Sequence, residues 1–525
     1  MISELTSATA AKTSVWAATT KVPSFPSLTE NAHCDVCVVG AGIAGLTTAY
    51  LLTRAGRTVV VLDDGPLAGG MTQMTTAHLS NAIDDRYIEI EKLHGEEGAR
   101  LAAESHTAAI NRIELIARKE QIECDFDRVD GYLFLGPDDK EELLDRELAA
   151  AHRAGLSQVE KMRRAPLPGC DTGPCLRFPE QGQFHPLKYL AGLAKAIQHG
   201  GGRIYTKTHA DEIHGGVPAH VRCGSYDVLT EAIVVATNTP INDRVVIHTK
   251  QAPYMTYAIG ARVPRGSVTK ALYWDTPDPY HYVRLQSMKS TPGQHNGNGS
   301  SSGDYDLLIV GGEDHKTGQE NDTQQRHARL EMWARERFPM MDGIEFTWSG
   351  QVMETVDGLA FIGRNPMDEQ NVYIVTGDSG MGMTHGTIAG ILLTDLIEGR
   401  ENPWAKLYDP ARKTLRAAGT FMKEALNVAV QYTGWVTGSD VRSVDDIPPD
   451  HGAVIRRGLS KVAIYRDESG TLHERSAVCP HLGCIVAWNP NEKTWDCPCH
   501  GSRFSKLGKP INGPANSELS RLNGK

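Results

Sequence analysis

The sequence has no long uninterrupted apolar run. A membrane-spanning helix needs about 20 consecutive apolar residues, and the apolar segment 388–397 is broken by Gly390, Thr394 and Asp395. The N-terminus also lacks the basic start and the apolar block that together form a secretory signal. We therefore expect a cytoplasmic protein without a membrane-spanning segment.

An excess of positive charge is also absent. The 525 residues include 54 Lys and Arg against 64 Asp and Glu, which gives a net charge of −10, and no basic run is longer than a pair. Nucleic acids and anionic membranes attract basic surfaces, so the composition argues against both as partners. Hydrophobic residues make up 40% of the chain and charged residues 22%. These fractions are typical of a globular protein, and the length allows about three domains.

Cysteine is too sparse for a disulfide scaffold, because the chain has ten in 525 residues. Four of these ten lie between Cys479 and Cys499, and that clustering is the strongest local signal in the sequence. Cys34 and Cys37 form a C-x-x-C pair inside an apolar run that predicts a buried strand. We interpret them as core thiols, with a redox or metal-binding role as the alternative.

The residue patterns divide the chain into four parts. Residues 1–32 are rich in Ser, Thr, Ala and Pro without periodicity, and they predict a loosely ordered arm. Residues 33–400 alternate strand and helix patterns and predict a large α/β body. Within that body, the Gly-, Ser- and Asn-rich segment 289–303 predicts a flexible loop between two strands. Residues 401–449 indicate a linker with one helix, and residues 450–525 indicate a small domain of short strands.

A glycine-rich turn follows the first strand pattern. The apolar run 34–39 leads into the motif G-A-G-I-A-G, and a helical pattern continues from it. Gly40, Gly42 and Gly45 suit a tight turn, a close approach of the backbone to a pyrophosphate, and close packing of helix on strand. The helix N-terminus then offers free N–H groups to the phosphates. The pattern predicts a dinucleotide site, and the alternative is an ordinary strand-to-helix turn.

Two acidic residues follow the next apolar run, residues 58–62. An acid at the end of this strand binds the ribose hydroxyls of a bound adenosine in dinucleotide-binding folds. We assign this role to Asp63, and Asp64 is its close competitor. Together with the strand before and the helix after the glycines, the acid makes the dinucleotide prediction much more specific than the glycines alone.

With these residues in view, the chain resembles the amine and D-amino-acid oxidase family of flavoproteins over about residues 33–400. The matching segments are G-A-G-I-A-G (40–45), G-G-M-T-Q-M-T-T-A-H (69–78), V-V-A-T-N-T-P (234–240), D-G-L-A-F-I-G (357–363) and T-G-D-S-G-M-G-M-T-H-G (376–386). The resemblance implies FAD as the dinucleotide. It also implies a Rossmann-like α/β FAD-binding domain, formed by about 33–100, 186–245 and 350–400, and an α+β substrate domain, formed by about 101–185 and 246–349.

The resemblance also implies which residues surround the cofactor. The ADP half would contact Gly40, Gly42, Gly45 and Asp63, and the backbone near Ala210 would lie beside adenine. The residues implied nearer the flavin ring are Gly70, Thr72, His78, Gly377, Asp378, Gly382, Met383 and Thr384. A glycine-rich turn that opens a helix would direct N–H donors at the charge that develops on a reduced flavin.

His78 stands in a T-A-H sequence that is similar to the T-W-H of family members whose histidine is joined covalently to the flavin. Two other interpretations of His78 stay open: it hydrogen-bonds near the cofactor, or it only packs against its neighbours.

The chain departs from the family pattern at the substrate carboxylate. Many amino-acid-oxidising members carry an Arg before D-G-L-P that grips this carboxylate, and here Val352 aligns with that Arg. A simple α-amino acid is therefore a doubtful substrate, although Arg284 could replace the missing side chain. The candidate catalytic residues are Tyr254, Tyr257, His281, Tyr282 and Arg284. Alternating aromatic residues on a strand are more often core, which is the alternative for these positions.

The C-terminal cysteines occur with two histidines in a repeated arrangement. Cys479-Pro-His481 is followed, after 15 residues, by Cys497-Pro-Cys-His500. Two thiolates and two imidazoles at this spacing fit a [2Fe–2S] centre with one iron held by Cys and the other by His. A Cys2His2 zinc site uses the same ligand types and is the alternative. A zinc finger separates its Cys pair from its His pair, however, whereas each half here carries one of each.

The segments C-P-H-L-G-C (479–484), C-P-C-H-G-S (497–502) and N-G-P-A (512–515) closely resemble Rieske domains. The resemblance implies that Cys479 and Cys497 bind one iron and that His481 and His500 bind the other. It also implies a disulfide between Cys484 and Cys499, as in the respiratory type of Rieske protein. Ser502 would donate to a cluster sulfur, and Phe504 replaces a Tyr donor of high-potential relatives, so we expect a moderate potential.

The combined prediction is an FAD-dependent dehydrogenase. It would oxidise an amine-like small molecule at a C–N bond, as the family resemblance implies, and pass the electrons through the cluster to an external acceptor protein or molecule. The alternative is an NAD(P)H-linked reductase that feeds a partner enzyme, but no second G-x-G-x-x-G follows a strand pattern. A Rieske oxygenase would need two His and a carboxylate for a mononuclear iron, and His209 and His214 lack a suitably spaced acid.

Overall fold

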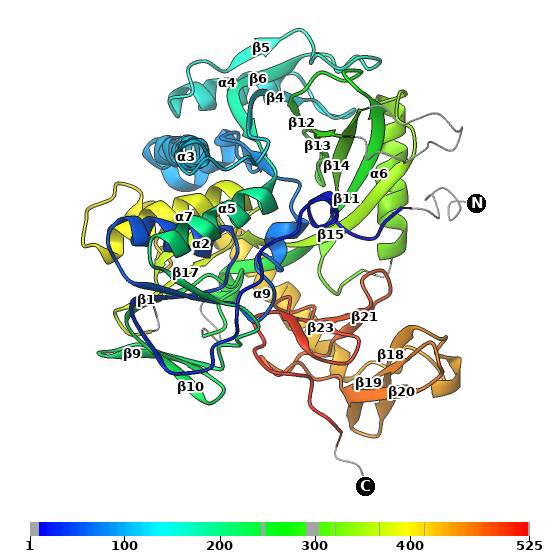
Figure 1. The fold of residues 1–525 in the computed structure, drawn as a ribbon. Coiled ribbons are helices and arrows are strands. Elements are labelled where there is room, and N and C mark those ends of the chain that lie inside the picture. The colour runs from blue at the N-terminus through cyan, green and yellow to red at the C-terminus, as the bar shows by residue number, and fades with distance from the viewer. Residues whose placement is uncertain are drawn as a thin grey trace.

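The computed structural model describes residues 10–242, 247–289, 304–320, 322–366, 368–413 and 415–522. The predicted loop 289–303 lies almost entirely outside these residues. The described part contains two large sheets and two small ones, with the small sheets in the C-terminal region. Figure 1 shows the two large sheets side by side, with the C-terminal region against one side of them. Among the described helices, none has the length and apolar character required to cross a membrane.

The first large sheet has a parallel core with helices on one face. Its main strands, in spatial order, are β16 (Phe361–Arg364), β17 (Val372–Thr376), β10 (Tyr226–Val235), β1 (Ala32–Val39), β2 (Val59–Leu62) and β7 (Arg203–Tyr205). The short strands β8 (Glu212–His214) and β9 (Ala219–Cys223) extend β10 in antiparallel pairing. All four residues of β2 are buried, as expected for a strand that is covered on both faces.

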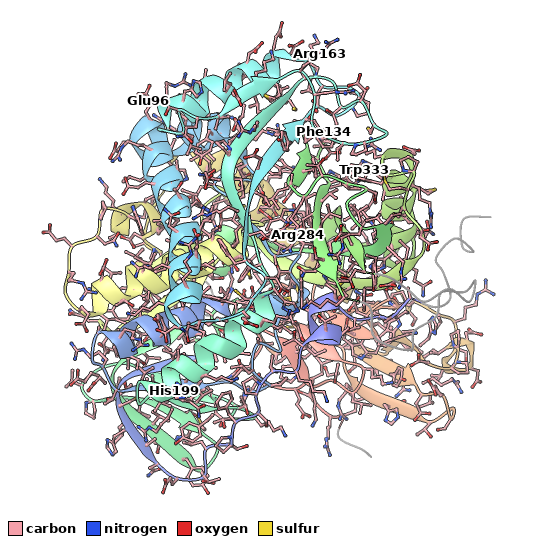
Figure 2. The ribbon with its side chains drawn as sticks, turned by 45° about the horizontal axis from the view of Figure 1, so that its top comes forward. Glu96, Phe134, Arg163, His199, Arg284 and Trp333 are labelled. Carbon is pink, nitrogen blue, oxygen red and sulfur yellow. A yellow bond between two sulfur atoms is a disulfide. The ribbon has the colours of Figure 1, made fainter. Side chains whose placement is uncertain are left out.

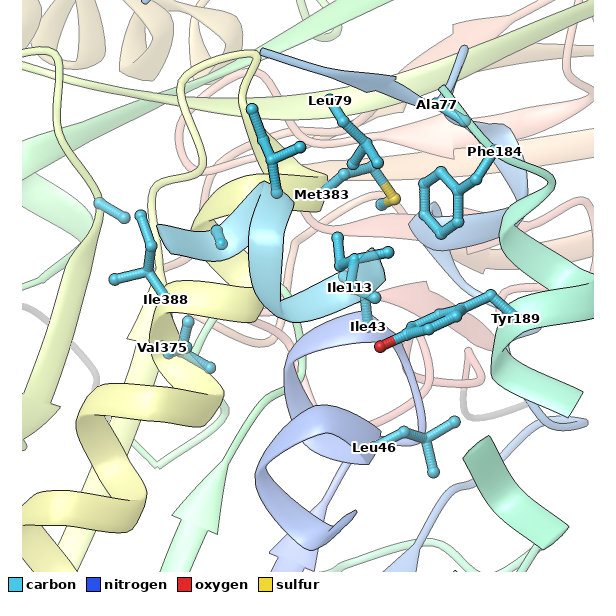
Figure 3. Packing of buried hydrophobic residues seen from close by; sticks show 14 of the residues in the cluster. Ile43, Leu46, Ala77, Leu79, Ile113, Phe184, Tyr189, Val375, Met383 and Ile388 are labelled. Atoms are coloured by element: carbon cyan, nitrogen blue, oxygen red, sulfur yellow. The ribbon is translucent and has the colours of Figure 1, made fainter. Parts of the chain in front are cut away.

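Three helices pack over this sheet, which are α2 (Ile43–Arg54), α5 (Pro186–His199) and α7 (Gly382–Ile397). α2 and α7 approach each other closely, because Gly386 lies against Ile43 and Gly390 lies against Thr47, and a Cβ at either glycine would crowd these side chains. Figure 3 shows the apolar side chains of Ile43, Leu46, Met383 and Ile388 in the core beside this contact. The contact fixes the N-termini of α2 and α7 relative to each other.

The second large sheet is mostly antiparallel. Its order is β15 (Ile344–Thr355), β11 (Gln251–Pro264), β14 (Tyr305–Lys316), β13 (Tyr282–Met288), β12 (Leu272–Asp275), β4 (Asp127–Phe134), β6 (Cys175–Gln183) and β3 (His78–Leu79), with β5 (Glu160–Met162) beside β6. Its helices are α3 (Arg86–Lys119), α4 (Glu142–Arg153) and α6 (Thr323–Arg337). β3 and the second half of β15 fall in segments that the sequence assigns to FAD binding, yet they pair in this second sheet.

The described part of the N-terminal arm, residues 10–32, contacts the body. Val15–Thr19 form the short helix α1, capped by the Ser14 hydroxyl. Trp16 is fully buried, and its indole N–H donates to the carbonyl oxygen of Thr75 at 2.6 Å. A single large aromatic side chain thus anchors this part of the arm to the body.

The C-terminal region begins with short helices and continues as two small antiparallel sheets. The helical part comprises α8 (Ala405–Tyr408), η3 (Leu415–Ala417), α9 (Ala418–Gln431), η4 (Tyr432–Trp435) and η5 (Val444–Asp446). The first small sheet is β18 (His451–Arg457), β19 (Ser460–Arg466) and β20 (Leu472–Ser476). The second is β21 (Ala487–Asn489), β22 (Thr494–Asp496), β23 (Arg503–Ser505) and β24 (Pro510–Asn512).

Direct hydrogen bonds join this region to the body. The Ser349 hydroxyl donates to Glu492 at 2.6 Å, and the Asn516 amide donates to the carbonyl oxygen of Ala210 at 2.9 Å. The first contact reaches the second large sheet, and the other reaches the connection that follows β7. The second small sheet and the segment after it therefore contact both halves of the body.

Candidate active site and cluster-binding loops

The glycine turn between β1 and α2 has no room for side chains. Gly40 has a φ of +107°, and a Cβ there would collide with the carbonyl oxygen of Ala236. A Cβ at Gly45 would collide with the carbonyl oxygen of Gly40, and one at Gly42 would lie 3.0 Å from the Thr72 hydroxyl. The glycines therefore leave the backbone amides at the N-terminus of α2 uncovered by side chains, as binding of a pyrophosphate requires.

Asp63 follows β2, and its carboxylate accepts a hydrogen bond from the backbone of the glycine turn. Its Oδ2 accepts from the amide of Ala41 at 2.7 Å, and its Oδ1 accepts from the amide of Gly65 at 2.8 Å. Burial raises the pKa of Asp63 to about 6, although these two amides act in the opposite direction. Asp64 is more exposed and lies 3.4 Å from His209. Both acids border the same cavity.

One cavity of about 560 Å³ extends from this turn to the second large sheet. It is lined by these predicted cofactor residues: Gly40, Gly42, Asp63, Gly70, Thr72, His78, Ala210, Asp378, Gly382 and Met383. The cavity and the glycine cradle together fit a dinucleotide with an extended shape. The N-terminus of α7 opens into the same cavity, so its free amides face the end that lies far from Asp63.

The structure places three other predicted cofactor residues behind this lining. Gly45 acts in helix-to-strand packing, as described above. Gly377 has a φ of +76° and leaves room for the side chain of Thr355. The Thr384 hydroxyl bonds with His106 Nδ1 at 2.9 Å and donates to the carbonyl oxygen of Met381. These residues therefore shape the turn before α7 without lining the cavity.

His78 lines the cavity as a neutral imidazole. Its Nδ1 lies 3.1 Å from the Thr76 hydroxyl, and its Nε2 lies 3.3 Å from the carbonyl oxygen of Val283. The carbonyl can only accept, so the bonds assign the proton to Nε2 and leave the lone pair on Nδ1. Burial, followed by the nearby Arg284 charge, lowers the pKa of His78 to about 3.

Two of the candidate catalytic tyrosines line the cavity. The Tyr282 hydroxyl bonds with Thr256 Oγ1 at 2.6 Å, and the Tyr257 hydroxyl bonds with His315 Nε2 at 3.0 Å. Burial raises the pKa of Tyr257 and that of Tyr282 above the ordinary value of a tyrosine. Both hydroxyls are therefore protonated donors or acceptors in a buried network.

Tyr254, His281 and Arg284 do not line this cavity. The His281 ring stacks on Trp333 with centroids 4.3 Å apart, and its Nδ1 lies 3.0 Å from Asp275. The Tyr254 ring lies under the Lys316 ammonium at 5.7 Å.

Arg284 is fully buried in the interior of the body (Figure 2). Its guanidinium donates to the carbonyl oxygens of Ala77 at 2.8 Å and Phe184 at 3.0 Å, and it lies over the Trp16 ring. These contacts occupy the guanidinium with main-chain acceptors, so Arg284 does not replace the missing carboxylate clamp.

Three carboxylates that the sequence did not indicate line the cavity near the second sheet. They are Asp84, Asp314 and Glu354. Burial raises the pKa of Asp84 and of Asp314 to about 7, and burial followed by the neighbouring carboxylates raises that of Glu354 well above its ordinary value. They come from segments far apart in the chain, so no local motif could reveal them.

The predicted cluster ligands come together in two loops, one before β21 and one between β22 and β23 (Figure 1). The thiols of Cys479 and Cys497 are hydrogen-bonded, and this bond lowers the pKa of Cys479. The rings of His481 and His500 have centroids 5.0 Å apart. Ser502 also hydrogen-bonds to Cys479 and accepts from the amide of Ala515 at 3.0 Å.

Cys484 and Cys499 form a disulfide that joins the two loops, with their Cα atoms 6.4 Å apart. The sulfurs of Cys484, Cys497 and Cys499 lie within 4.8 Å of one another and could suggest a metal site. Two of these sulfurs are already bonded to each other, however, so among the three only Cys497 keeps a thiol that could bind a metal. The remaining donor set is two thiols and two imidazoles from separate loops, which fits a [2Fe–2S] cluster.

The cluster loops contact the wall of the cavity. Gln351 lines the cavity, and its amide Nε2 donates to the carbonyl oxygen of Gly501 at 2.8 Å. Gly501 has a φ of +78°, and a Cβ there would collide with Pro253. His248, in the short helix η2 (His248–Lys250), lies beside both predicted His ligands, with ring centroids 4.9 Å from His481 and 6.1 Å from His500.

Residues 35–396 match the family described as FAD dependent oxidoreductase. The chain belongs to this family. Residues 438–523 match the Rieske [2Fe-2S] domain. These matches confirm the predicted flavoprotein and Rieske resemblances, the predicted fold class, and FAD and a Rieske cluster as cofactors. The protein is an FAD-dependent oxidoreductase.

Known proteins resemble the whole chain and each of its parts. The chain is 32% identical over 511 residues to the Rieske 2Fe-2S iron-sulfur protein YhfW of Bacillus subtilis (strain 168), which covers 97% of both chains. It is 28% identical over 434 residues to gamma-glutamylputrescine oxidoreductase of Escherichia coli (strain K12), covering 78% of this chain and 95% of the relative. Glycine oxidase from Geobacillus kaustophilus shares the fold, with a TM-score of 0.58 at 14% identity, over 73% of this chain and 100% of that one.

Proposed function

We propose that the protein is an amine dehydrogenase that passes electrons from its flavin to its own Rieske cluster and then to an external acceptor. The observation that carries the proposal is the position of Gln351. Its side chain borders the FAD-sized cavity and at the same time bonds to Gly501, the residue that follows the predicted iron ligand His500. One side chain therefore separates the two cofactor sites, and both lie in one chain.

Two cofactors divide the chemistry. FAD, when bound, would supply a two-electron acceptor for the C–N bond of the amine, and a Rieske cluster would supply a one-electron carrier towards the external acceptor. Because both centres belong to one chain, their contact does not depend on protein concentration.

The residues around the cavity have defined roles in this proposal. The glycine turn and Asp63 hold the ADP half, and the N-terminus of α7 stabilises negative charge at the opposite end. Tyr282 and His78 pack edge to face, with centroids 5.6 Å apart, and form part of the wall between these ends. Val352 stands where many relatives carry the carboxylate-binding Arg, which favours an amine over an α-amino acid.

A pair of glutamine variants tests the electron route. In Gln351→Leu, we expect amine to bleach the flavin but the flavin-to-cluster transfer to slow, because the bond to the cluster loop is lost. Gln319→Leu is the matched control: Gln319 also donates to a cluster-loop carbonyl, Pro498, at 3.1 Å, but it does not line the cavity. Anaerobic rapid mixing, read by flavin absorbance and by the paramagnetic signal of the reduced cluster, separates the two steps.

Equal transfer rates in the two variants would contradict the role of Gln351. Reduction by NAD(P)H alone, with no amine active, would replace the proposal by the reductase alternative. The cytoplasmic location expected from the sequence is part of the proposal, and cell fractionation with an antibody to this chain tests it.

A further inference from the structure

The three carboxylates in the cavity have no lysine or arginine partner in the described part of the chain. Asp84 precedes α3, Asp314 lies on β14 and Glu354 lies on β15, and they repel one another. Among the described residues that line the cavity, none is a Lys or an Arg. Three acidic groups therefore lie at the end of the cavity formed by the second sheet, with no basic Lys or Arg side chain in the described lining.

The hydrogen bonds of these carboxylates come from neutral groups. The Tyr280 hydroxyl donates to Asp84 Oδ2 at 2.5 Å, Thr256 bonds to Asp314, and Ser379 bonds to Glu354. Asp314 Oδ1 is buried and has no hydrogen-bond partner in the described part of the chain. His281 lies near Asp314, but its ring is already bonded to Asp275.

Two other buried carboxylates of this chain are paired with arginines. Asp357 pairs with Arg412 at 2.6 Å, and Asp496 pairs with Arg503 at 3.1 Å. Burying a carboxylate without a cation is costly, so a protein normally supplies a basic partner. The contrast indicates that the cation for Asp84, Asp314 and Glu354 comes from a ligand.

Two independent features of the same cavity also suit a cationic ligand with N–H donors. Gln351 is 4% exposed, and its Oε1, an acceptor, has no partner in the described residues. Aromatic rings of Tyr280, Tyr282 and Trp274 line the cavity, and the first two have centroids 5.3 Å apart. Aromatic faces attract ammonium groups, most strongly where water is excluded.

We infer that the substrate is an aliphatic amine with a second positive charge, such as a diamine or an oligoamine. The inference rests on the proposed function and narrows its substrate class. One nitrogen is oxidised at the flavin, and the other ammonium group is held by Asp84, Asp314 and Glu354 beside the tyrosine rings. A substrate carboxylate would be repelled by the same groups, in agreement with Val352 at the place of the family's Arg.

A matched pair of substrates tests the inference with the FAD-loaded protein. Butane-1,4-diamine and butan-1-amine offer the same reacting group and the same carbon chain, and they differ in the second charge. We expect kcat/KM for anaerobic flavin reduction to favour the diamine on the order of ten-fold or more. Glu354→Gln and Asp314→Asn should each reduce this ratio several-fold. The control Asp127→Asn, which removes a carboxylate paired with Lys270 outside the cavity, should leave it unchanged.

A binding measurement gives a readout that does not depend on turnover. Hexamethonium carries two quaternary ammonium groups and cannot be oxidised at a neutral nitrogen. We expect calorimetry to detect its binding to the oxidised protein, and we expect tetramethylammonium to bind more weakly. Glu354→Gln should weaken hexamethonium binding several-fold, whereas Asp127→Asn should not. FAD content and circular dichroism verify that each variant is folded.

The outcomes separate this inference from the proposed function. If butan-1-amine and butane-1,4-diamine reduce the flavin equally well, the protein is an amine dehydrogenase but the second-charge inference is wrong. If neither amine reduces the flavin and hexamethonium still binds in a Glu354-dependent manner, the cation site stands and the proposed oxidation fails. If hexamethonium binding is absent or unaffected by Glu354→Gln, the inference is overturned.

Discussion

The cluster-binding loops and the carboxylate end of the cavity contrast in how the sequence encodes them. The cluster ligands lie in two short segments, 479–484 and 497–502, and a disulfide holds the two loops together. The three carboxylates lie in three segments separated by up to 270 residues, and only the second sheet and the start of α3 bring them to one cavity. Local spacing thus encodes where the cofactors bind, whereas the fold creates the charge that selects the substrate.

The largest effect that tests this contrast is loss of a cofactor through one local change. We expect Gly40→Ala to lower the FAD content of the purified protein severely, because the new Cβ would collide with the carbonyl oxygen of Ala236 at a positive φ. Gly343→Ala is the control, since nothing lies within 4 Å of a Cβ there and its φ is not positive. Flavin absorbance per chain measures the result. Full FAD occupancy in Gly40→Ala would contradict the claim that the glycine turn at Gly40 binds the cofactor.

A smaller, graded effect is expected at the carboxylate end when the pH changes. Asp84 and Asp314 have pKa values raised to about 7 by burial, so they are largely protonated at pH 6 and largely charged at pH 8. The preference for butane-1,4-diamine over butan-1-amine should therefore rise several-fold over this interval. The ratio cancels the deprotonation of the reacting amine, which both substrates share. The other charged groups that act on these two carboxylates are Asp85, Asp278, His281 and Glu313.

Stopped-flow flavin reduction at several pH values measures this ratio, and Asp314→Asn should flatten its rise. A ratio that falls as the pH rises would contradict the assignment of a charge-binding role to these carboxylates.

The smallest expected effect concerns the reduction potential of the cluster. Ser502 hydrogen-bonds to Cys479, so Ser502→Ala should remove one donor to a cluster sulfur. A hydrogen bond to a charged group contributes about 1.5 kcal/mol, which corresponds to about a ten-fold change in an equilibrium constant. For a one-electron couple, a ten-fold change in the equilibrium constant shifts the reduction potential by about 59 mV. We expect the cluster potential to fall by about 60 mV in a redox titration. A rise, or no change, would show that Ser502 does not donate to the cluster.

Much of the fold and both cofactors could be predicted from the sequence, because the signals are local. The order of strand, glycine turn, helix and acid is the one found in dinucleotide-binding folds. The Cys and His spacing follows from the geometry of the cluster. The catalytic candidates were less predictable. Tyr282 and Arg284 lie on one face of β13, yet the first borders the cavity and the second meets the carbonyl oxygens of Ala77 and Phe184.

The difference between Tyr282 and Arg284 arises from the N-terminal arm. Trp16, from a segment predicted to be loosely ordered, is buried and packs its ring against the Arg284 guanidinium. The sequence contains no periodic signal for this contact, because one tryptophan in a five-residue helix provides it. The same limit applies to Asp84, Asp314 and Glu354, which only the tertiary fold assembles.

The most direct test of the central claim is an anaerobic mixing experiment with butane-1,4-diamine on the protein and on Cys497→Ser. In the unmodified protein, we predict that the flavin bleaches and that the paramagnetic signal of a reduced Rieske cluster then appears. In Cys497→Ser, we predict that FAD is retained and bleached, while the cluster signal and electron delivery to the natural acceptor are lost. A bleached flavin beside a cluster that stays oxidised in the unmodified protein would contradict electron transfer through the cluster.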